Sequence, residues 1–329
     1  MKIKRALIFI LITALSLCTL VSCKKDGEGS TEAIYYTVTF NSNGGTPVES
    51  RQVAMNGKIG DPGIPEKEGY VFDGWYNGNL EWDFSMDMVK SDITLSARWL
   101  APENVFSHEP AGDGTTVITG VKKEVLKLTL PTAIGGYTVT AIGDRAFASL
   151  SSETYNTIIV PESITVIGDE AFKDCKGISI VVKGELTKVG ERSFYGCTRL
   201  SSISLAEGME TITAEAFASC TSLSSVRIPQ SVKTIGENAF DSCTSLKTVM
   251  LYAKDTVIEN MAFSDAGLKA VYFYGTEAEI DSLVEERVDA GNKEFIESDM
   301  LIYSETEPAE KTAYDGYWYL DANGAVRKW

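Results

Sequence analysis

A phrase of nine residues recurs through the middle of this chain, and its spacing constrains the fold more than any other feature. The phrase has the form I-G-x-x-A-F-x-x-C and is complete at Ile235–Cys243. Aligned on its phenylalanine it occurs six times, at intervals of 25, 22, 23, 23 and 23 residues. The aligned residues are Phe147, Phe172, Phe194, Phe217, Phe240 and Phe263. A period in the low twenties predicts a solenoid, because units this small bury their apolar sides only by stacking.

Each unit also contains an L-x-x-h-x-h segment, where h is aliphatic, and this segment predicts one strand per unit. The stretch Leu126–Pro131 supplies one further strand ahead of the first full unit. Thr213 and Glu259 stand where the other units have the glycine of the phrase, so the turn is less uniform there. We assign residues 114–274 to the repeat array.

The cysteine of the phrase is present in four successive units. These residues are Cys175, Cys197, Cys220 and Cys243. Equivalent positions of stacked units have parallel side-chain directions, which makes disulfide geometry hard to reach. We therefore expect free thiols that fill the core, with disulfides as the alternative. The spacing lacks a C-x-x-C pair, which disfavours a zinc site.

Residues that vary between the units are the candidate binding site. If Leu223, Val226 and Ile228 face the core, Arg227 faces outward, since side chains alternate along a strand. We call the outward row the candidate strip: Ile159, Val181, Ser204, Arg227, Met250 and Tyr272, with Thr129 ahead of them. A second outward row is mostly hydroxyl-bearing or small: Lys127, Thr157, Ser179, Ser202, Ser225, Thr248 and Ala270. The strip indicates a protein-binding surface, and scattered exposed apolar residues are the alternative.

The repeated phrase resembles the BspA-like (Treponema-type) leucine-rich-repeat family. The resemblance covers about 160 residues of the chain. It implies a leucine-rich-repeat solenoid that serves surface adhesion or ligand binding, without indicating which ligand.

The amino terminus has the features of a secretion signal. A basic stretch, Met1–Arg5, precedes an apolar run, and Leu20–Cys23 resembles a bacterial lipobox. We predict a lipoprotein signal peptide at residues 1–22, lipidation of Cys23 and a polar spacer at residues 23–35. An ordinary signal peptide is the alternative. The protein is then extracytoplasmic and tethered to the membrane by its lipid, at the cell surface.

Residues 36–99 form a separate aromatic-rich segment. The stretch Gly69–Tyr76 packs four aromatic residues into eight, which favours the core of a small module over a carbohydrate site. The pattern from Phe40 through Gly69–Tyr76 to Trp99 resembles the Listeria–Bacteroides repeat. It implies a small β-grasp-like module that acts as a stalk or spacer. Residues 100–113 are interpreted as a linker, with His108 as a solvated residue in it.

Residues 275–329 are expected to cap the array with a helix and a hairpin. Ile280, Leu283, Val284 and Val288 share one face of a helix that Thr276 and Glu279 would cap. The stretch Gly316–Trp329 resembles a single choline-binding or cell-wall-binding repeat. A terminal two-strand hairpin is the simpler interpretation.

Composition excludes several functions. The net charge of −16 disfavours nucleic acid as a partner, and a single histidine leaves little acid–base or metal chemistry. We therefore expect no enzyme activity, no metal and no cofactor. The sequence predicts a mainly β chain with some α, in which a leucine-rich-repeat solenoid follows a small β-grasp-like module. We expect the protein to be anchored by lipid and to bind a protein ligand on a host or bacterial surface. Glycan or cell-wall binding through exposed aromatics, or a purely structural envelope spacer, are the alternatives.

Overall fold

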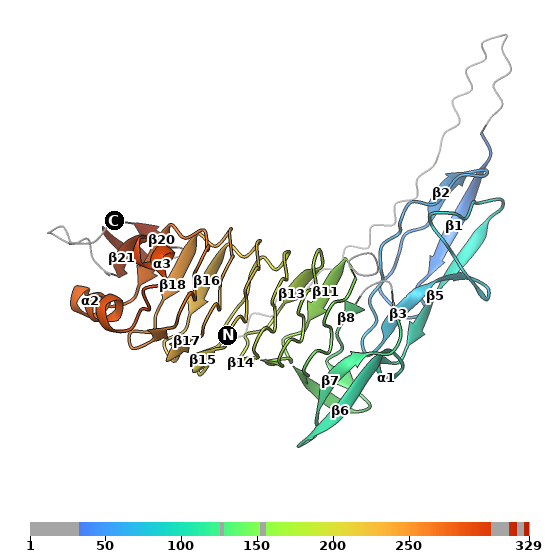
Figure 1. Ribbon diagram of the computed structural model, residues 1–329. Coiled ribbons are helices and arrows are strands. Elements are labelled where there is room, and N and C mark those ends of the chain that lie inside the picture. Colours follow the sequence, from blue (N-terminus) through green and yellow to red (C-terminus); the bar gives the residue numbers. More distant parts are fainter. Residues whose placement is uncertain (1–32, 126–127, 152–155, 304–315, 321–325, 329) are drawn as a thin grey trace, which may run out of the picture.

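The computed structural model describes residues 33–125, 128–151, 156–303, 316–320 and 326–328. Figure 1 shows an elongated molecule, with a twisted sheet at one end and a row of stacked units running to the other. The chain is mainly β, as predicted. The predicted signal peptide, Cys23 and most of the spacer lie outside the described residues, as do Trp329 and the turn expected within the terminal hairpin.

The N-terminal module is a five-stranded sheet in the order β2 (Arg51–Ala54), β1 (Tyr35–Asn41), β5 (Ile93–Leu100), β3 (Val71–Asn77) and β4 (Leu80–Glu81). Strands β1 and β5 are parallel and central, and the other pairs are antiparallel. This arrangement agrees with a β-grasp-like sheet, although residues 33–100 contain no helix. Phe40, Phe72 and Trp75 pack edge to face at centroid distances of 5.0 and 5.7 Å and form its core.

The segment interpreted as a linker is ordered, so that prediction was wrong. Helix α1 (Pro102–Val105) leads into β6 (Phe106–Gly112), which pairs antiparallel with β7 (Thr115–Val121). Val105 and Phe106 are fully buried, because together with Val71 of the module they belong to the core of the array. His108 is half-buried rather than solvated, with its Nδ1 3.1 Å from Thr116 Oγ1.

The array has two parallel ladders facing each other across the core. The first, which we call the strand face, contains β8 (Leu128–Thr129), β11 (Thr157–Val160) and β13 (Ser179–Val182), then β16 (Ser225–Ile228), β18 (Thr248–Leu251) and β20 (Ala270–Phe273). The second contains β7, β10 (Tyr137–Ile142), β12 (Val166–Ile167) and β14 (Lys188–Val189), then β15 (Thr211–Ile212), β17 (Thr234–Ile235) and β19 (Val257–Ile258). The short strand β9 (Ala133–Ile134) pairs antiparallel with β10.

Both ladders are interrupted in the middle of the array, the strand face between β13 and β16 and the second ladder between β14 and β15. Between β13 and β16 the segment 202–205 makes only an isolated bridge, Leu186 to Leu205. A Cβ on Gly190 or Gly236 would approach backbone nitrogen of the preceding unit to 2.5 or 2.8 Å, so glycine permits this close stacking. Thr213 occupies the corresponding place, and its hydroxyl instead donates to Val189 O at 3.1 Å. The interruption of the second ladder thus coincides with the missing glycine.

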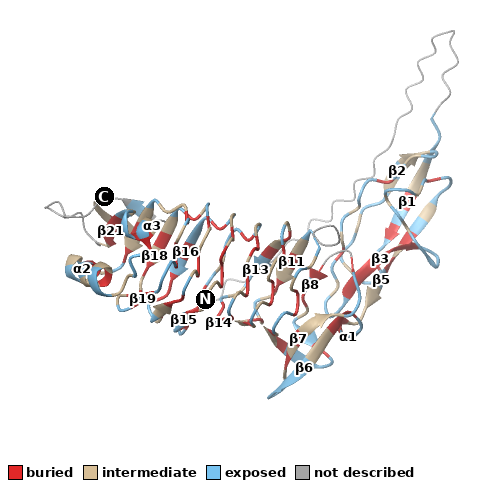
Figure 2. Ribbon diagram, in the orientation of Figure 1, coloured by how far each residue is buried: buried red, intermediate tan, exposed pale blue. Residues whose placement is uncertain are grey.

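The six phenylalanines form a continuous stack inside the array. Successive rings lie 5.2–5.5 Å apart and are nearly parallel, at 6–15°. All six are fully buried, and so are the four cysteines beside them. Figure 2 shows buried residues recurring from unit to unit along the solenoid. The predicted core positions are therefore confirmed.

The array continues beyond residue 274, where it was expected to end. Phe295 of α3 (Lys293–Ile296) stacks on Phe263 at 5.2 Å, and β21 (Asp299–Tyr303) extends the strand face parallel to β20. The hairpin of β22 (Gly316–Leu320) and β23 (Val326–Lys328) extends it further. The predicted helix is present as α2 (Glu277–Glu286), with the capping box of Thr276 and Glu279 and with Ile280 and Leu283 buried.

Candidate ligand-binding face of the array

The candidate strip lies on the strand face in the predicted register. Ile159 pairs with Thr129 and with Val181, while Met250 pairs with Arg227 and Tyr272. Because these pairs are in register, their side chains point to the same side of the ladder. The structure thus aligns the strip residues within each of its two halves, Thr129 to Val181 and Arg227 to Tyr272.

Ser204 is the exception within the strip. It is exposed, but it belongs to the unit that forms no regular strand. Its carbonyl accepts a hydrogen bond from the amide of Leu186 at 3.0 Å, so it lies out of register with Val181. The serine-rich run Ser201–Ser204 favours this outcome, since serine hydroxyls compete for backbone hydrogen bonds.

The strip residues differ in how freely they can meet a ligand. Val181 is 42% exposed. Arg227 is engaged twice, since its Nη2 lies 3.1 Å from Glu207 Oε1 and its guanidinium lies 4.4 Å from the centre of the Tyr252 ring. Tyr272 contacts Trp318 edge to face at 5.7 Å. Val181 and the half-buried Met250 are therefore the positions where a substitution disturbs the fold least.

A second row of aromatic residues lies beside the C-terminal part of the strip, and sequence reasoning missed it. Tyr252 stacks on Tyr274 at 5.2 Å, and Tyr274 contacts Tyr303 at 4.4 Å. Trp318 packs against this row and is fully buried, with its Nε1 donating to Phe273 O at 3.0 Å. The available signal was an aromatic residue two positions after the strip residue in two successive units, as at Tyr252 and Tyr274.

Burial of Trp318 bears on the resemblance of Gly316–Trp329 to a cell-wall-binding repeat. An aromatic cage needs an accessible ring face, and this ring contributes to the packing of the array instead. The hairpin interpretation is confirmed by the antiparallel pairing of β22 and β23.

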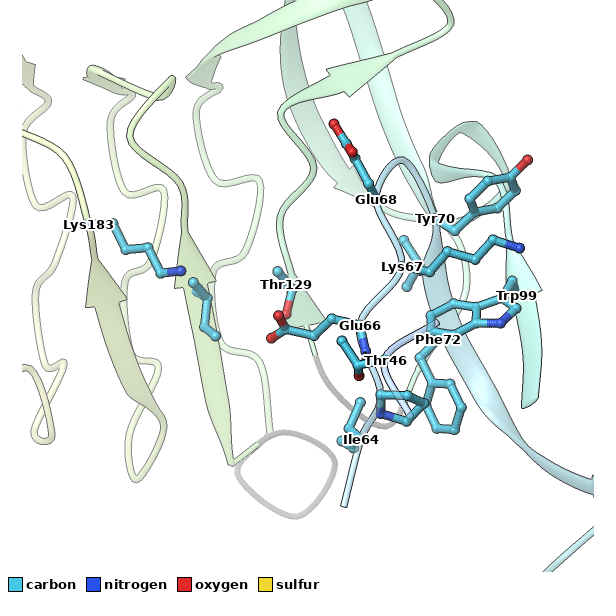
Figure 3. Close-up of a pocket in the computed structure, with 13 residues that line it drawn as sticks. Thr46, Ile64, Glu66, Lys67, Glu68, Tyr70, Phe72, Trp99, Thr129 and Lys183 are labelled. Atoms are coloured by element: carbon cyan, nitrogen blue, oxygen red, sulfur yellow. Dashed lines mark hydrogen bonds between the residues drawn. The ribbon is translucent and has the colours of Figure 1, made fainter. Parts of the chain in front are cut away.

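At its N-terminal end the strand face borders a hollow of about 430 Å³ between the array and the module. Figure 3 shows residues of both parts lining this hollow: Thr129 and Lys183 come from the array, and Glu66 points toward Thr129 from the module, where Lys67 and Trp99 also lie. Ile159 of the strip also lines it. The hollow beside the strip is therefore lined by residues of both the array and the module.

The module's aromatic residues are divided between core and surface. Phe72, Trp75 and Tyr76 are buried, as the core interpretation predicted, whereas Tyr70 is exposed. The ammonium of Lys67 lies 4.5 Å from the centre of the Tyr70 ring and 5.8 Å from that of Trp99. Lys67 also donates to Asn43 O at 3.0 Å, so this cation is fixed against both rings.

The four array cysteines form no disulfides, and their thiols are expected to be unreactive. Each Sγ donates to the carbonyl of a phenylalanine in the preceding unit at 3.0–3.2 Å. Burial raises the pKa of Cys175 and Cys243 to about 12 and raises the pKa of Cys197 and Cys220 well above its ordinary value. A nucleophilic cysteine needs the thiolate, so these residues are structural.

Metal clusters and bilayer-spanning helices are absent from the described residues. No group of three or more histidine, cysteine, aspartate or glutamate side chains there is placed to hold a metal ion. None of the helices in the same ranges is long and apolar enough to cross a bilayer.

Comparison with known families identifies both parts of the chain. Residues 127–217 and 165–284 match the model of the BspA type leucine rich repeat region, in six copies. Residues 36–98 match the Listeria-Bacteroides repeat domain. Both resemblances stated from the sequence are confirmed.

Relatives match only part of this chain. A protein of Evansella cellulosilytica described as a Gly-rich membrane protein is 38% identical over 96 residues, which is 28% of this chain and 11% of the relative. Internalin H of Listeria monocytogenes is 36% identical over 109 residues, or 32% of this chain and 19% of the relative. The chain thus spans less than a fifth of the length of these curated relatives.

Two solved structures are similar to this chain. A leucine rich cell surface protein of Faecalibacterium prausnitzii has a TM-score of 0.49 and 26% identity, covering 68% of this chain and 58% of its own. A leucine rich repeat protein of T. pallidum has a TM-score of 0.43 and 22% identity, covering 57% of this chain and 97% of its own.

Proposed function

We propose that this chain, which carries a BspA-type leucine-rich-repeat region C-terminal to a Listeria–Bacteroides repeat domain, is a lipid-anchored bacterial surface protein. In this proposal it binds protein ligands through the strand face. It acts by adhesion and catalyses no reaction. Host proteins or proteins of another bacterial cell are the proposed partners.

One observation carries this proposal: the strand face is poor in charge within a strongly acidic chain. From β8 to β20, Arg227 is the one charged side chain among the described residues of the two outward rows, although the chain carries a net charge of −16. Lys127, which begins the second row, lies outside the described residues. The centres of protein interfaces are depleted of charged residues in the same way. Val181, Met250 and Tyr272 supply apolar contact area along this face.

A pull-down tests the proposal. Residues 24–329, which include every described residue, are immobilised and exposed to surface protein fractions of host and bacterial cells. We expect discrete proteins to be retained, and retention to be lost when Val181 and Met250 are both changed to glutamate. The Ser225→Ala variant, altered in the neighbouring row, serves as the control. Equal retention by the glutamate variant would place binding elsewhere.

The anchor is tested separately. In the proposed lipoprotein Cys23 carries the acyl chains, and more than one chain gives stable membrane attachment. We expect the full-length chain to partition into detergent after expression in a bacterium, and the Cys23→Ala variant to remain in the aqueous phase. Detergent partitioning by that variant would show that membrane attachment does not depend on Cys23.

A further inference from the structure

The two ladders of the array end differently on the N-terminal side. The second ladder is extended past β10 by β7 and then by β6. The strand face stops at β8, which has β11 as its one strand neighbour among the described elements. The outer edge of β8 is therefore an open sheet edge, and such an edge is a template for pairing with another chain.

The backbone of Thr129 faces this open edge. The amide of Leu130 donates to Ile159 O at 2.9 Å, and Ile159 is the register partner of Thr129. In a parallel ladder this geometry directs the amide and carbonyl of alternate residues to opposite sides, so those of Thr129 point away from β11. Within the described residues no backbone partner of Thr129 is found on that side. One donor and one acceptor are thus available.

The hollow lies beside the same edge, and its lining combines charged side chains, such as Glu66 and Lys183, with an apolar part. Thr129 and Ile159 line it from the array, while Ile64, Pro65 and Phe72 line it from the module. Its volume of about 430 Å³ lies within the range of sites that bury small ligands and is ample for one large side chain. Lys67 is held against Tyr70 and Trp99, which leaves those ring faces poorly placed to stack on a sugar.

We infer that an extended segment of a protein ligand adds as a strand beside β8, with hydrogen bonds to the backbone of Thr129 and a large apolar side chain in the hollow. This is strand addition at a sheet edge, in which main-chain bonds give affinity and a pocket for alternate side chains gives specificity. The inference rests on the proposed function and names the place and the conformation of the bound segment. It also makes the module a wall of the binding site.

Proline at Thr129 tests the main-chain bond directly. Proline lacks the amide hydrogen, and Thr129→Pro removes the free edge donor without removing a ladder bond, since Leu128 and Leu130 make the bonds to β11. Thr129→Val is the matched control, because it alters the side chain and keeps the amide. Ile159→Glu tests the hollow by placing a charge in the apolar part of its wall.

The probe is a phage-displayed library of random peptides, selected on residues 24–329. We expect the selected peptides to share a large apolar residue. As synthetic peptides they should bind Thr129→Pro and Ile159→Glu at least about tenfold more weakly, and Thr129→Val within about twofold of the parent protein. The thermal midpoints of the variants should stay close to that of the parent, which shows that the fold is intact.

Two results would overturn the inference: selection that enriches no peptide, or peptides that bind Thr129→Pro as tightly as the parent protein. Peptides lost through Met250→Glu and unaffected by Thr129→Pro would remove the edge site and leave the proposed function standing. Conversely, Thr129-dependent peptide binding together with an empty pull-down would support the edge site and contradict the wider proposal.

Discussion

The phenylalanine stack shows how a single residue type holds the array together. Each ring is buried and contacts the equivalent ring of the neighbouring unit, so a truncated ring leaves a cavity that the flanking rings cannot fill. We expect Phe217→Ala to lower the free energy of unfolding by about 3–5 kcal/mol. Urea denaturation followed by circular dichroism measures this. Ser225→Ala, on the exposed row, should change it by less than about 0.5 kcal/mol.

The cysteines make a prediction about alkaline pH. Their folded pKa lies above the ordinary value of about 9, at about 12 for Cys175 and Cys243, so the fold favours the protonated thiol. The stability linked to these thiols is fully present below pH 9 and is lost as the pH rises from about 9 toward 12.

We expect a variant with all four cysteines changed to alanine to lose less stability than the parent protein over this window. Alanine is a natural choice, because Ala266 occupies the same position in the last unit and is buried. Denaturation midpoints at stepped pH provide the measurement. Parallel curves for the two proteins would mean that the thiols do not titrate on unfolding.

At the residue scale, positions that recur in every unit could be predicted from the sequence. Contacts that occur in only one unit could not. Periodicity placed Phe147 to Phe263, the cysteines and most of the strip, because equivalent positions stack in register. The aromatic contacts of Tyr303 with Tyr274 and Trp318 join the end of the predicted array to β21 and β22, which lie beyond it. No periodic signal marks contacts of that kind.

Among the elements, the C-terminal cap shows how the array ends. The amide of each stacked phenylalanine donates to a carbonyl of the next unit, as Phe240 does to Ala262 at 2.7 Å. Phe263 is followed by the turn that carries α3 instead of a further copy of the phrase, and its amide donates to Asn292 Oδ1 at 3.0 Å. The side chain of Asn292 is buried and donates to Glu259 O at 2.8 Å, so one amide group replaces a missing repeat.

We expect Asn292→Ala to cost about 1–3 kcal/mol, because it leaves the buried amide of Phe263 without an acceptor. Hydrogen exchange should show lost protection concentrated at Phe263 and the units beside it. Asn260→Ala, an exposed asparagine nearby, is the control and should leave exchange unchanged. Uniform loss of protection in both variants would contradict a capping role.

Composition misled the element assignment of residues 100–113. Pro102, Pro110 and Gly112 suggested a linker, yet Val105 and Phe106 bury against the first unit and β6 pairs with β7. Proline is tolerated here because Pro102 begins a helix and Pro110 lies on an edge strand. Thr213, flagged as a departure from the repeat, does coincide with the broken ladder, whereas Glu259 keeps its backbone bond to Ile235 O at 2.9 Å.

For the whole molecule, the interface between the module and the array determines whether the hollow keeps a fixed shape. Lys123 of the array lies 2.6 Å from Asp73 of the module, whose carboxylate is 7% exposed and also accepts from Tyr76. Val71 of the module shares the core of the array. The module is therefore attached rigidly rather than through a flexible linker.

We expect Lys123→Met to lower the free energy of unfolding by about 1–3 kcal/mol, because it leaves a buried carboxylate without its cation. Lys122→Met is the matched control, since Lys122 Nζ makes only an exposed contact to Glu103 O at 3.2 Å. Tryptophan fluorescence, which reports the module through Trp75, follows the unfolding. Equal stability of the two variants would show that apolar contacts alone stabilise the interface between the module and the array.

Site-specific photocrosslinking tests the central claim, that the strand face binds a protein ligand. Benzoylphenylalanine is placed at Val181 or Met250 on that face, or at the exposed Glu237 on another side of the array, and residues 24–329 are illuminated with surface protein fractions. We predict discrete protein adducts from positions 181 and 250 and none from position 237. Adducts from position 237 alone, or no adducts from the strand face, would contradict the account.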